Sequence, residues 1–131
     1  MKSEKQCIGG PVVINGRNLS LSKAVRAGNF IFLTGQVPMR DTVPMTDGTI
    51  EEQTRSCLDN IKATLELCGC GLADVVKTTV WLKSRDDFAG FNSTYAEYFP
   101  HDPPARSGLV CDFLIDIRVE IECVAYISNG T

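Results

Sequence analysis

The sequence predicts an α+β fold, a two-layer sandwich in which two helices cover one face of a mixed β-sheet. The first observation is the order of its periodic segments. Hairpins with alternating apolar residues are interleaved with two stretches of helical spacing, in the order β-β-(β)-α-β-α-β-β. The second observation is size, because 131 residues of 44% hydrophobic composition suit one globular domain. The chain shows no internal repeat, linker or low-complexity tract, so we expect residues 1–131 to form a single domain.

The first strands are recognised by their turn residues. Residues 1–15, which contain a Gly-Gly-Pro break, are expected to form a loose arm that enters a first short strand. Residues 23–27 and 30–34 should be two strands joined by a tight turn at Gly28-Asn29, because glycine readily adopts the positive φ that such a turn needs. Residues 40–48 are rich in turn formers and should be a loop.

Two helices are predicted from a cap and from apolar stripes. Thr49 and Glu52 have capping-box spacing, so a helix should begin there and end at Gly69 or Gly71. The second helix should begin at residues 84–87. Its apolar stripe consists of Phe88, Phe91, Tyr95 and Phe99.

A strand rich in β-branched residues should lie between the helices, over residues 74–84. Alternation places Val76, Thr78, Val80 and Leu82 on one face and Trp81 on the more polar face. A tryptophan on that side suggests that the second face of the sheet is covered, and identical subunits are the usual cover.

The stretch from Pro103 to Cys123 carries the candidate chemistry. Two prolines stiffen the approach to Arg106, and a later alternating strand places Glu120 opposite its apolar face. The arginine and a glutamate on a neighbouring strand could face each other across a small cleft. The guanidinium would hold a carboxylate ligand, and the glutamate would manage a water. From the residues alone, a solvated loop arginine and a glutamate on a wetted sheet face are the simpler interpretation.

Charge and composition narrow the classes of function. The net charge of −3 with no basic cluster argues against a nucleic-acid surface. The N-terminal residues contain no apolar signal core, and no apolar run is long enough for a membrane span, so we expect a cytoplasmic protein. Six cysteines without zinc-site spacing and a single histidine, His101, predict no metal site.

Seven fragments in this order and spacing resemble the RidA/YjgF family of reactive-intermediate deaminases, also called endoribonuclease L-PSP-like proteins. They are AVRAGN (24–29), FLTGQVP (32–38), DNIK (59–62), DVVKTTV (74–80), FAGFNSTY (88–95), PARS (104–107) and VEIE (119–122). Each is weak alone, but their joint arrangement is specific and covers nearly the whole chain.

The resemblance implies a chorismate-mutase-like α+β domain that forms a homotrimer, with three ligand clefts between adjacent subunits. It implies hydrolysis of 2-imino acids, such as 2-iminobutanoate and 2-iminopropanoate, to 2-oxo acids and ammonia, with no cofactor. Some relatives act as ribonucleases or translation inhibitors, and others bind small metabolites without known turnover.

The resemblance also assigns residues. Arg106 matches the arginine that holds the substrate carboxylate, and Glu120 matches the glutamate near the attacking water. Thr34, Gly35 and Asn92 match further substrate-binding positions. These matches reverse the simpler interpretation of Arg106 and Glu120.

Two positions depart from the family pattern. Gly108, in the substrate-binding region, stands where the deaminases often have cysteine, and Leu21 stands where they often have tyrosine. Neither change removes the charge chemistry, but both keep open a protein that binds keto acids without turnover. A ribonuclease is less expected, because the sequence offers no histidine pair, metal-binding carboxylates or basic groove.

Overall fold

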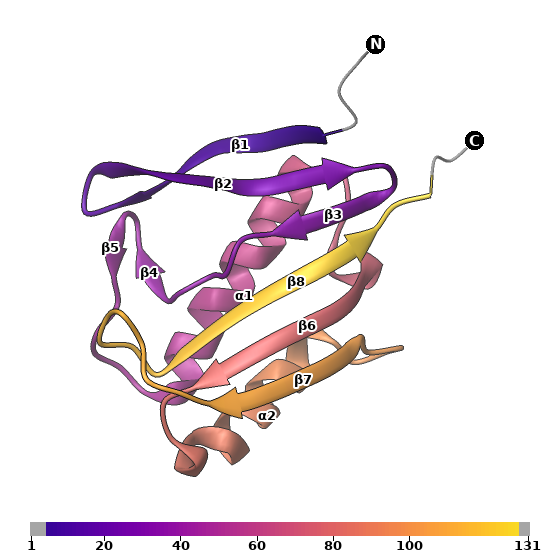
Figure 1. Ribbon diagram of the computed structural model, residues 1–131. Helices are drawn as coiled ribbons and strands as arrows, with labels where there is room; N and C mark the ends of the chain where they lie inside the picture. The colour runs from indigo at the N-terminus through magenta and orange to yellow at the C-terminus, as the bar shows by residue number, and fades with distance from the viewer. Residues whose placement is uncertain (1–4, 129–131) are drawn as a thin grey trace.

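The computed structural model describes residues 5–128, which form a six-stranded sheet, a small ribbon and two helices (Figure 1). The main sheet consists of β1 (Lys5–Ile14), β2 (Arg17–Ala27), β3 (Phe30–Leu33), β6 (Val75–Leu82), β7 (Ala105–Val110) and β8 (Val119–Tyr126). The other elements are the ribbon of β4 (Met39–Arg40) and β5 (Val43–Pro44), the helices α1 (Ile50–Leu67) and α2 (Phe88–Tyr98), and the 3-10 turns η1 (Leu72–Asp74) and η2 (Arg85–Asp87).

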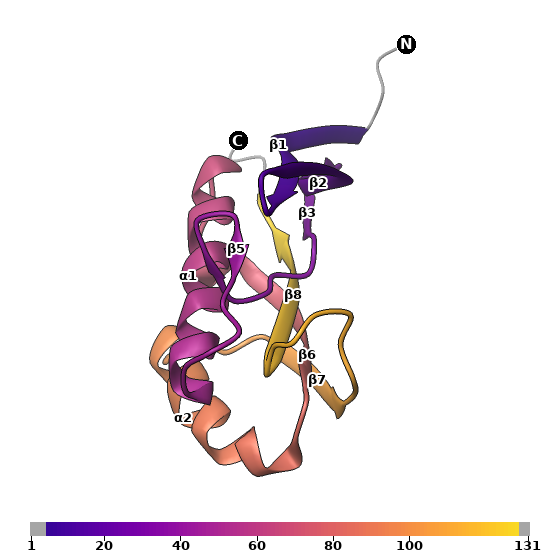
Figure 2. The ribbon, with the colours of Figure 1, turned by 90° about the vertical axis from the view of Figure 1, so that its left-hand side faces the viewer.

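The strand order in the sheet is β1-β2-β3-β8-β6-β7. Only the pair β6 and β7 is parallel, because α2 forms the crossover between them, whereas the other pairs are antiparallel. Both helices cover the same face of the sheet (Figure 2). These findings confirm the predicted α+β sandwich with a mixed sheet.

The predicted start and end of α1 are confirmed. The Thr49 hydroxyl accepts a hydrogen bond from the Glu52 N–H at 3.1 Å, and the Glu52 carboxylate accepts one from the Thr49 N–H at 2.8 Å. The helix ends before Gly69, whose φ of +82° continues the chain in the left-handed region.

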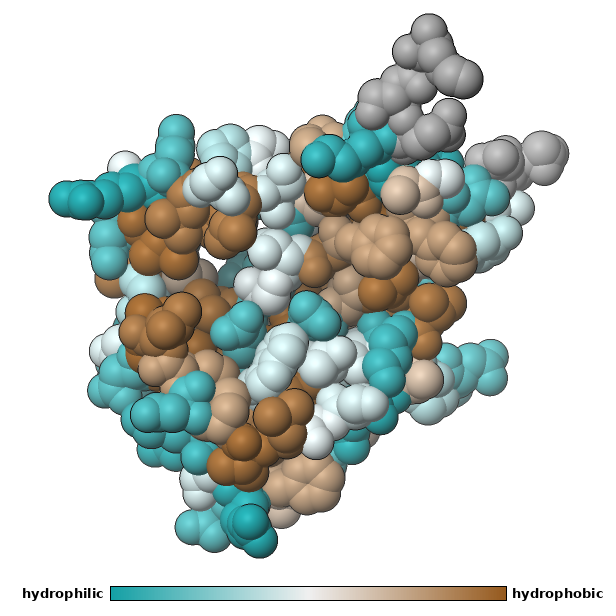
Figure 3. All heavy atoms as spheres, viewed as in Figure 1, coloured by the Kyte–Doolittle hydropathy of each residue, from teal (hydrophilic) through white to brown (hydrophobic). Residues whose placement is uncertain are grey.

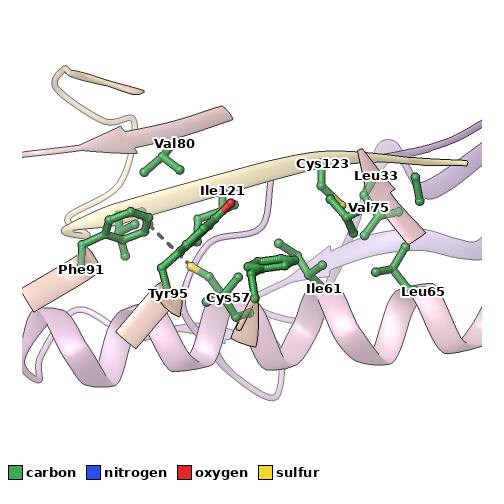
Figure 4. Packing of buried hydrophobic residues seen from close by; sticks show 14 of the residues in the cluster. Leu33, Cys57, Ile61, Leu65, Val75, Val80, Phe91, Tyr95, Ile121 and Cys123 are labelled. Carbon is green, nitrogen blue, oxygen red and sulfur yellow. Dashed lines mark hydrogen bonds between the residues drawn. The ribbon is translucent and has the colours of Figure 1, made fainter. Parts of the chain in front are cut away.

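The core lies between α1, α2 and the inner face of the sheet (Figure 4). Cys57, Ile61 and Leu65 of α1 pack there with Ile121 of β8 and Phe91 of α2, and all five side chains are buried. Burying a side chain of the size of leucine contributes roughly 1.5–3 kcal/mol. This shared core fixes the position of α2 relative to β6 and β7, on which the candidate site depends.

The expectation of a loose arm over residues 1–15 is wrong for Lys5–Ile14, which form the edge strand β1 paired with β2. Gly9 and Gly10 interrupt the pairing with φ values of +87° and +74°, and the strand then continues through Pro11. The break is therefore a bulge, which an edge strand tolerates together with a proline. Residues 1–4 lie outside the described residues.

Two smaller expectations also need correction. Residues 40–48 are not wholly loop, because Met39–Arg40 and Val43–Pro44 pair as a short ribbon. Val76 does not share the buried face of Thr78, since a register shift between Val75 and Lys77 leaves its side chain 45% exposed.

The sheet face away from the helices, here called the open face, carries exposed apolar side chains (Figure 3). Phe30 stacks at an edge-to-face angle on Tyr126 with ring centroids 5.3 Å apart, and Phe32 lies beside them. These rings are 43–45% exposed, which is unusual for a cluster of aromatic side chains. No helix among residues 5–128 combines the length and the apolar character needed to cross a membrane.

Candidate functional site

Arg106 lies on the edge strand β7 and points to the helix side of the sheet. The parallel register pairs Arg106 with Thr78, a buried residue on the inner face of β6. The guanidinium carbon lies 4.8 Å from the ring centroid of Tyr95, 5.4 Å from that of Phe91 and 6.0 Å from that of Phe88. Three rings of α2 therefore hold the cation by cation–π contact. Within residues 5–128 no carboxylate pairs with it.

The Tyr95 ring, which is nearest to the guanidinium, is held in place by a hydrogen bond to β6. The Tyr95 hydroxyl and the Thr78 hydroxyl share a buried hydrogen bond of 2.8 Å. Burial raises the pKa of Tyr95, so the phenol stays neutral and the ring keeps this bond. The aromatic stripe was predicted only as core. Its i, i+3 and i+7 spacing beside a strand that carries an arginine is the signal that could have identified the ring surface.

A cavity of about 350 Å³ opens beside Arg106. Arg85, Phe88 and Gly108 line it together with apolar residues of β6 and β7, and we call it the arginine cavity. A Cβ placed on Gly108 would come no closer than 3.5 Å to any neighbouring atom, so the missing side chain enlarges the cavity without a steric need for glycine. Arg85 was not identified from the sequence, because nothing in its local pattern distinguishes it from a solvated loop arginine.

Asn92 lies one turn after Phe88 on the same flank of α2. Its side-chain oxygen is buried and has no hydrogen-bond partner in the described part of the chain. A buried amide oxygen without a donor costs about 1–3 kcal/mol, so this position favours an added donor.

Glu120 lies on the open face, opposite to the face of Arg106. On β8 the neighbouring residues Val119 and Ile121 point into the core, and Glu120 pairs across the sheet with Trp81. Its carboxylate forms no ion pair within residues 5–128. Burial, and then the negative charge of Glu122, raise the pKa of Glu120. A carboxylate of this kind exchanges protons more readily near neutral pH than an ordinary one.

Gly35 leaves the space that the Glu120 carboxylate occupies. A Cβ on Gly35 would overlap a carboxylate oxygen of Glu120, so only glycine leaves room for this side chain. The backbones meet where Gln36 pairs with Ile121, through hydrogen bonds of 2.7 and 3.0 Å. Three residues separate Phe32 from Gln36, but only two separate their partners Val124 and Ile121, so the exit of β3 is bulged. The backbone at Gly35 therefore lies close to β8 and to the Glu120 side chain.

Thr34 lies in the same bulge and is half-buried. Its N–H donates to the Lys23 carbonyl at 3.1 Å, and its carbonyl accepts from the Gln36 side chain at 3.2 Å. Thr34 and Gly35 line a second cavity of about 320 Å³, which reaches between β1 and α1.

The structure thus separates the predicted site into two groups. Arg106 and Gly108 share the arginine cavity, with Asn92 on the adjoining helix flank, whereas Thr34 and Gly35 lie with Glu120. The expectation that Arg106 and Glu120 face each other from neighbouring strands is wrong within one chain, because β6 lies between β7 and β8 and the two side chains point to opposite faces.

The two groups offer different chemistry. A guanidinium without a carboxylate partner can bind a carboxylate ligand in a bidentate manner. A half-buried carboxylate with a raised pKa can hold and exchange the protons of a water. Within residues 5–128, no three histidine, cysteine or acidic side chains are arranged to hold a metal ion. Burial raises the pKa of Cys123 to about 12 and that of Cys70 to about 11, which keeps both thiols neutral.

Comparisons with known proteins agree with this fold. The model of the family described as Endoribonuclease L-PSP matches residues 17–127. A RutC family protein of Pyrococcus horikoshii is 48% identical over 80% of this chain and 85% of its own length. The 2-iminobutanoate/2-iminopropanoate deaminase of Escherichia coli K12 is 38% identical over 79% of this chain and 84% of its own. The crystal structure of the YjgF gene product of E. coli superposes with a TM-score of 0.80 at 34% identity, covering 92% of this chain and 98% of that one.

Proposed function

The chain belongs to the endoribonuclease L-PSP family, which includes the RidA/YjgF proteins, and we propose that it hydrolyses 2-imino acids to 2-oxo acids and ammonia. The observation that supports this most is Arg106, a guanidinium held on three aromatic rings beside a cavity and without a carboxylate partner among residues 5–128. This arrangement suits a small carboxylate ligand.

The complete site requires a second copy of the chain. Because Arg106 and Glu120 point to opposite faces, they meet only if Arg106 of one copy is placed against the open face of another. The exposed rings of Phe30, Phe32 and Tyr126 supply the apolar area that such a contact would bury. We propose a homotrimer, in which each contact is formed by one edge and one face and the ring closes.

In this arrangement Arg106 binds the substrate carboxylate and fixes the position of the imine carbon. Glu120 of the neighbouring copy accepts a proton from a water as it adds to that carbon. The carbon–nitrogen bond then breaks and the nitrogen leaves as ammonia with the transferred protons, so that one imine and one water give one 2-oxo acid and one ammonia. Each proton passes between Glu120, the water oxygen and the leaving nitrogen, so the reaction needs no cofactor.

A second candidate is a protein that binds 2-oxo acids without turnover. Two observations keep it open. Leu21, which is 48% exposed on β2, has no hydroxyl, and Gly108 contributes no side chain to the arginine cavity. Ribonuclease activity has no comparable support, because neither cavity combines a histidine with a basic lining. The cytoplasmic location stays a prediction from the sequence.

A coupled assay tests the proposal. A threonine dehydratase generates 2-iminobutanoate, and release of the 2-oxo acid is followed with wild type and with Arg106→Ala. We expect acceleration by wild type and none by the folded variant. Stabilisation of wild type by 2-oxobutanoate without any acceleration would favour the binding protein instead.

A further inference from the structure

The arginine cavity contains a second cation that the proposed reaction does not use. Arg85 and Arg106 both line it, and its lining includes no acidic residue. Neither guanidinium has an ion-pair partner within residues 5–128. The cavity therefore attracts ligands with more negative charge than a single carboxylate carries.

Arginines elsewhere in the chain behave differently. Arg40 pairs with Asp47 at 2.8 Å, and Arg55 pairs with Glu97 at 2.9 Å. Asp87, two residues after Arg85, already has a partner, because Arg118 contacts its carboxylate at 3.3 Å. Arg85 is thus left available beside the cavity, whereas Arg40, Arg55 and Arg118 are each paired with a carboxylate.

The backbone around Arg85 is held in place. It begins the turn η2, where the Ser84 hydroxyl accepts a hydrogen bond from the Asp86 N–H at 3.1 Å. The Arg85 carbonyl accepts the N–H of Phe88, whose ring bounds the Arg106 site at 6.0 Å. Arg85 is therefore anchored next to the same ring that contacts Arg106.

The space between the two cations suits a short methylene chain. Gly108 leaves the cavity floor open, and Leu82, Phe88 and Val110 give it apolar walls. A ligand with a carboxylate at each end of a short apolar chain would offer one carboxylate to each guanidinium and keep its carbons out of water.

We propose that the preferred substrates are 2-imino dicarboxylic acids, with the carboxylate next to the imine on Arg106 and the distal carboxylate on Arg85. This inference rests on the proposed function. The reaction is unchanged: water adds to the imine carbon, the carbon–nitrogen bond breaks, and a 2-oxo dicarboxylic acid and ammonia leave. A monocarboxylic imine of the same length still binds Arg106 through its carboxylate but leaves Arg85 solvated, so it is accepted without being favoured.

Two imines of equal chain length provide the test. An amino-acid oxidase generates 2-iminoglutarate from glutamate or 2-iminopentanoate from norvaline, and kcat/KM is measured for each. We expect the ratio of kcat/KM for 2-iminoglutarate to kcat/KM for 2-iminopentanoate to exceed one for wild type. This ratio should fall about tenfold in Arg85→Gln, as for loss of one charge-assisted contact. Lys62→Gln, the same charge change on the exposed side of α1, should keep the wild-type ratio.

The outcomes separate the two proposals. A wild-type ratio below one, or the same ratio in wild type and Arg85→Gln, overturns the dicarboxylate inference and leaves imine hydrolysis standing. If neither imine is hydrolysed, the proposed function fails. Calorimetric Kd values for 2-oxoglutarate and 2-oxopentanoate then decide the role of Arg85: tighter binding of 2-oxoglutarate that is lost in Arg85→Gln supports it, and equal binding overturns it.

Discussion

The surfaces around Arg106 and Glu120 are built in opposite ways. Arg106 rests on side chains, the three rings of α2, one of which is tied to β6 by the Tyr95–Thr78 hydrogen bond. The carboxylate of Glu120 occupies the space that a side chain at Gly35 would fill. The rings orient the guanidinium of Arg106 by contact, whereas Gly35 leaves room for the carboxylate of Glu120. Substitutions should therefore affect the two by different routes, through ligand geometry at Arg106 and through displacement at Glu120.

The largest effect is expected at the cation itself. Arg106→Lys keeps the charge but loses the planar pair of donors, so kcat/KM should fall at least about 100-fold. Turnover of 2-iminobutanoate measures this, with circular dichroism to establish that the variant is folded. Wild-type turnover in this variant would mean that the carboxylate is not held in a bidentate manner.

Mixing two inactive variants asks whether the two surfaces meet between copies. Co-expression of Arg106→Ala with Glu120→Gln should restore about a quarter of wild-type activity, because each cleft needs an intact arginine from one copy and an intact glutamate from the next. Each variant expressed alone is the control. Mixed assemblies without any activity would mean that Arg106 and Glu120 of one site come from the same chain, or that they do not act in one site.

A smaller effect is expected from filling the space at Gly35. In Gly35→Ala the new Cβ displaces the flexible carboxylate of Glu120, and kcat should fall about tenfold with little change in Tm. Gly71→Ala is the matched control, since a Cβ there meets nothing within 4 Å. Equal activity of the two variants would show that the position of Glu120 is unimportant.

The smallest effect concerns pH. Activity requires ionised Glu120, so kcat/KM should fall as the pH drops through the raised pKa of this carboxyl. Glu122→Gln removes the second cause of that raised pKa, so the acidic limb of the profile should move to lower pH. Glu66→Gln on the exposed side of α1 should leave the limb in place. A limb that moves to higher pH in Glu122→Gln would contradict this assignment of the base.

Much of the fold could be predicted because its signals are local. The capping box at Thr49 and the turn at Gly28-Asn29 each depend on a few adjacent residues. The Gly9-Gly10 pair was misinterpreted because a bulge and the end of a strand use the same residue type. Only the pairing of β1 with β2, over a distance in the sequence, distinguishes them.

The arrangement of the candidate residues could not be predicted from the sequence. Alternation assigns Glu120 to one face of its own strand, yet it does not relate that face to the one on which Arg106 lies. That relation depends on the parallel placement of β7 beside β6, which the crossover through α2 determines. Arg85 reaches the arginine cavity by the same route, so no short motif could reveal it.

The two edges of the sheet differ in their resistance to aggregation. The edge strand β1 has a glycine bulge and Pro11, which disrupt pairing with a foreign strand. The edge strand β7 pairs regularly over residues 105–110, and all of these residues are exposed in the single chain. A chain separated from its copies would present this regular edge, with Leu109 and Val110, to any other strand. In the proposed trimer, covering this edge would serve solubility as well as chemistry.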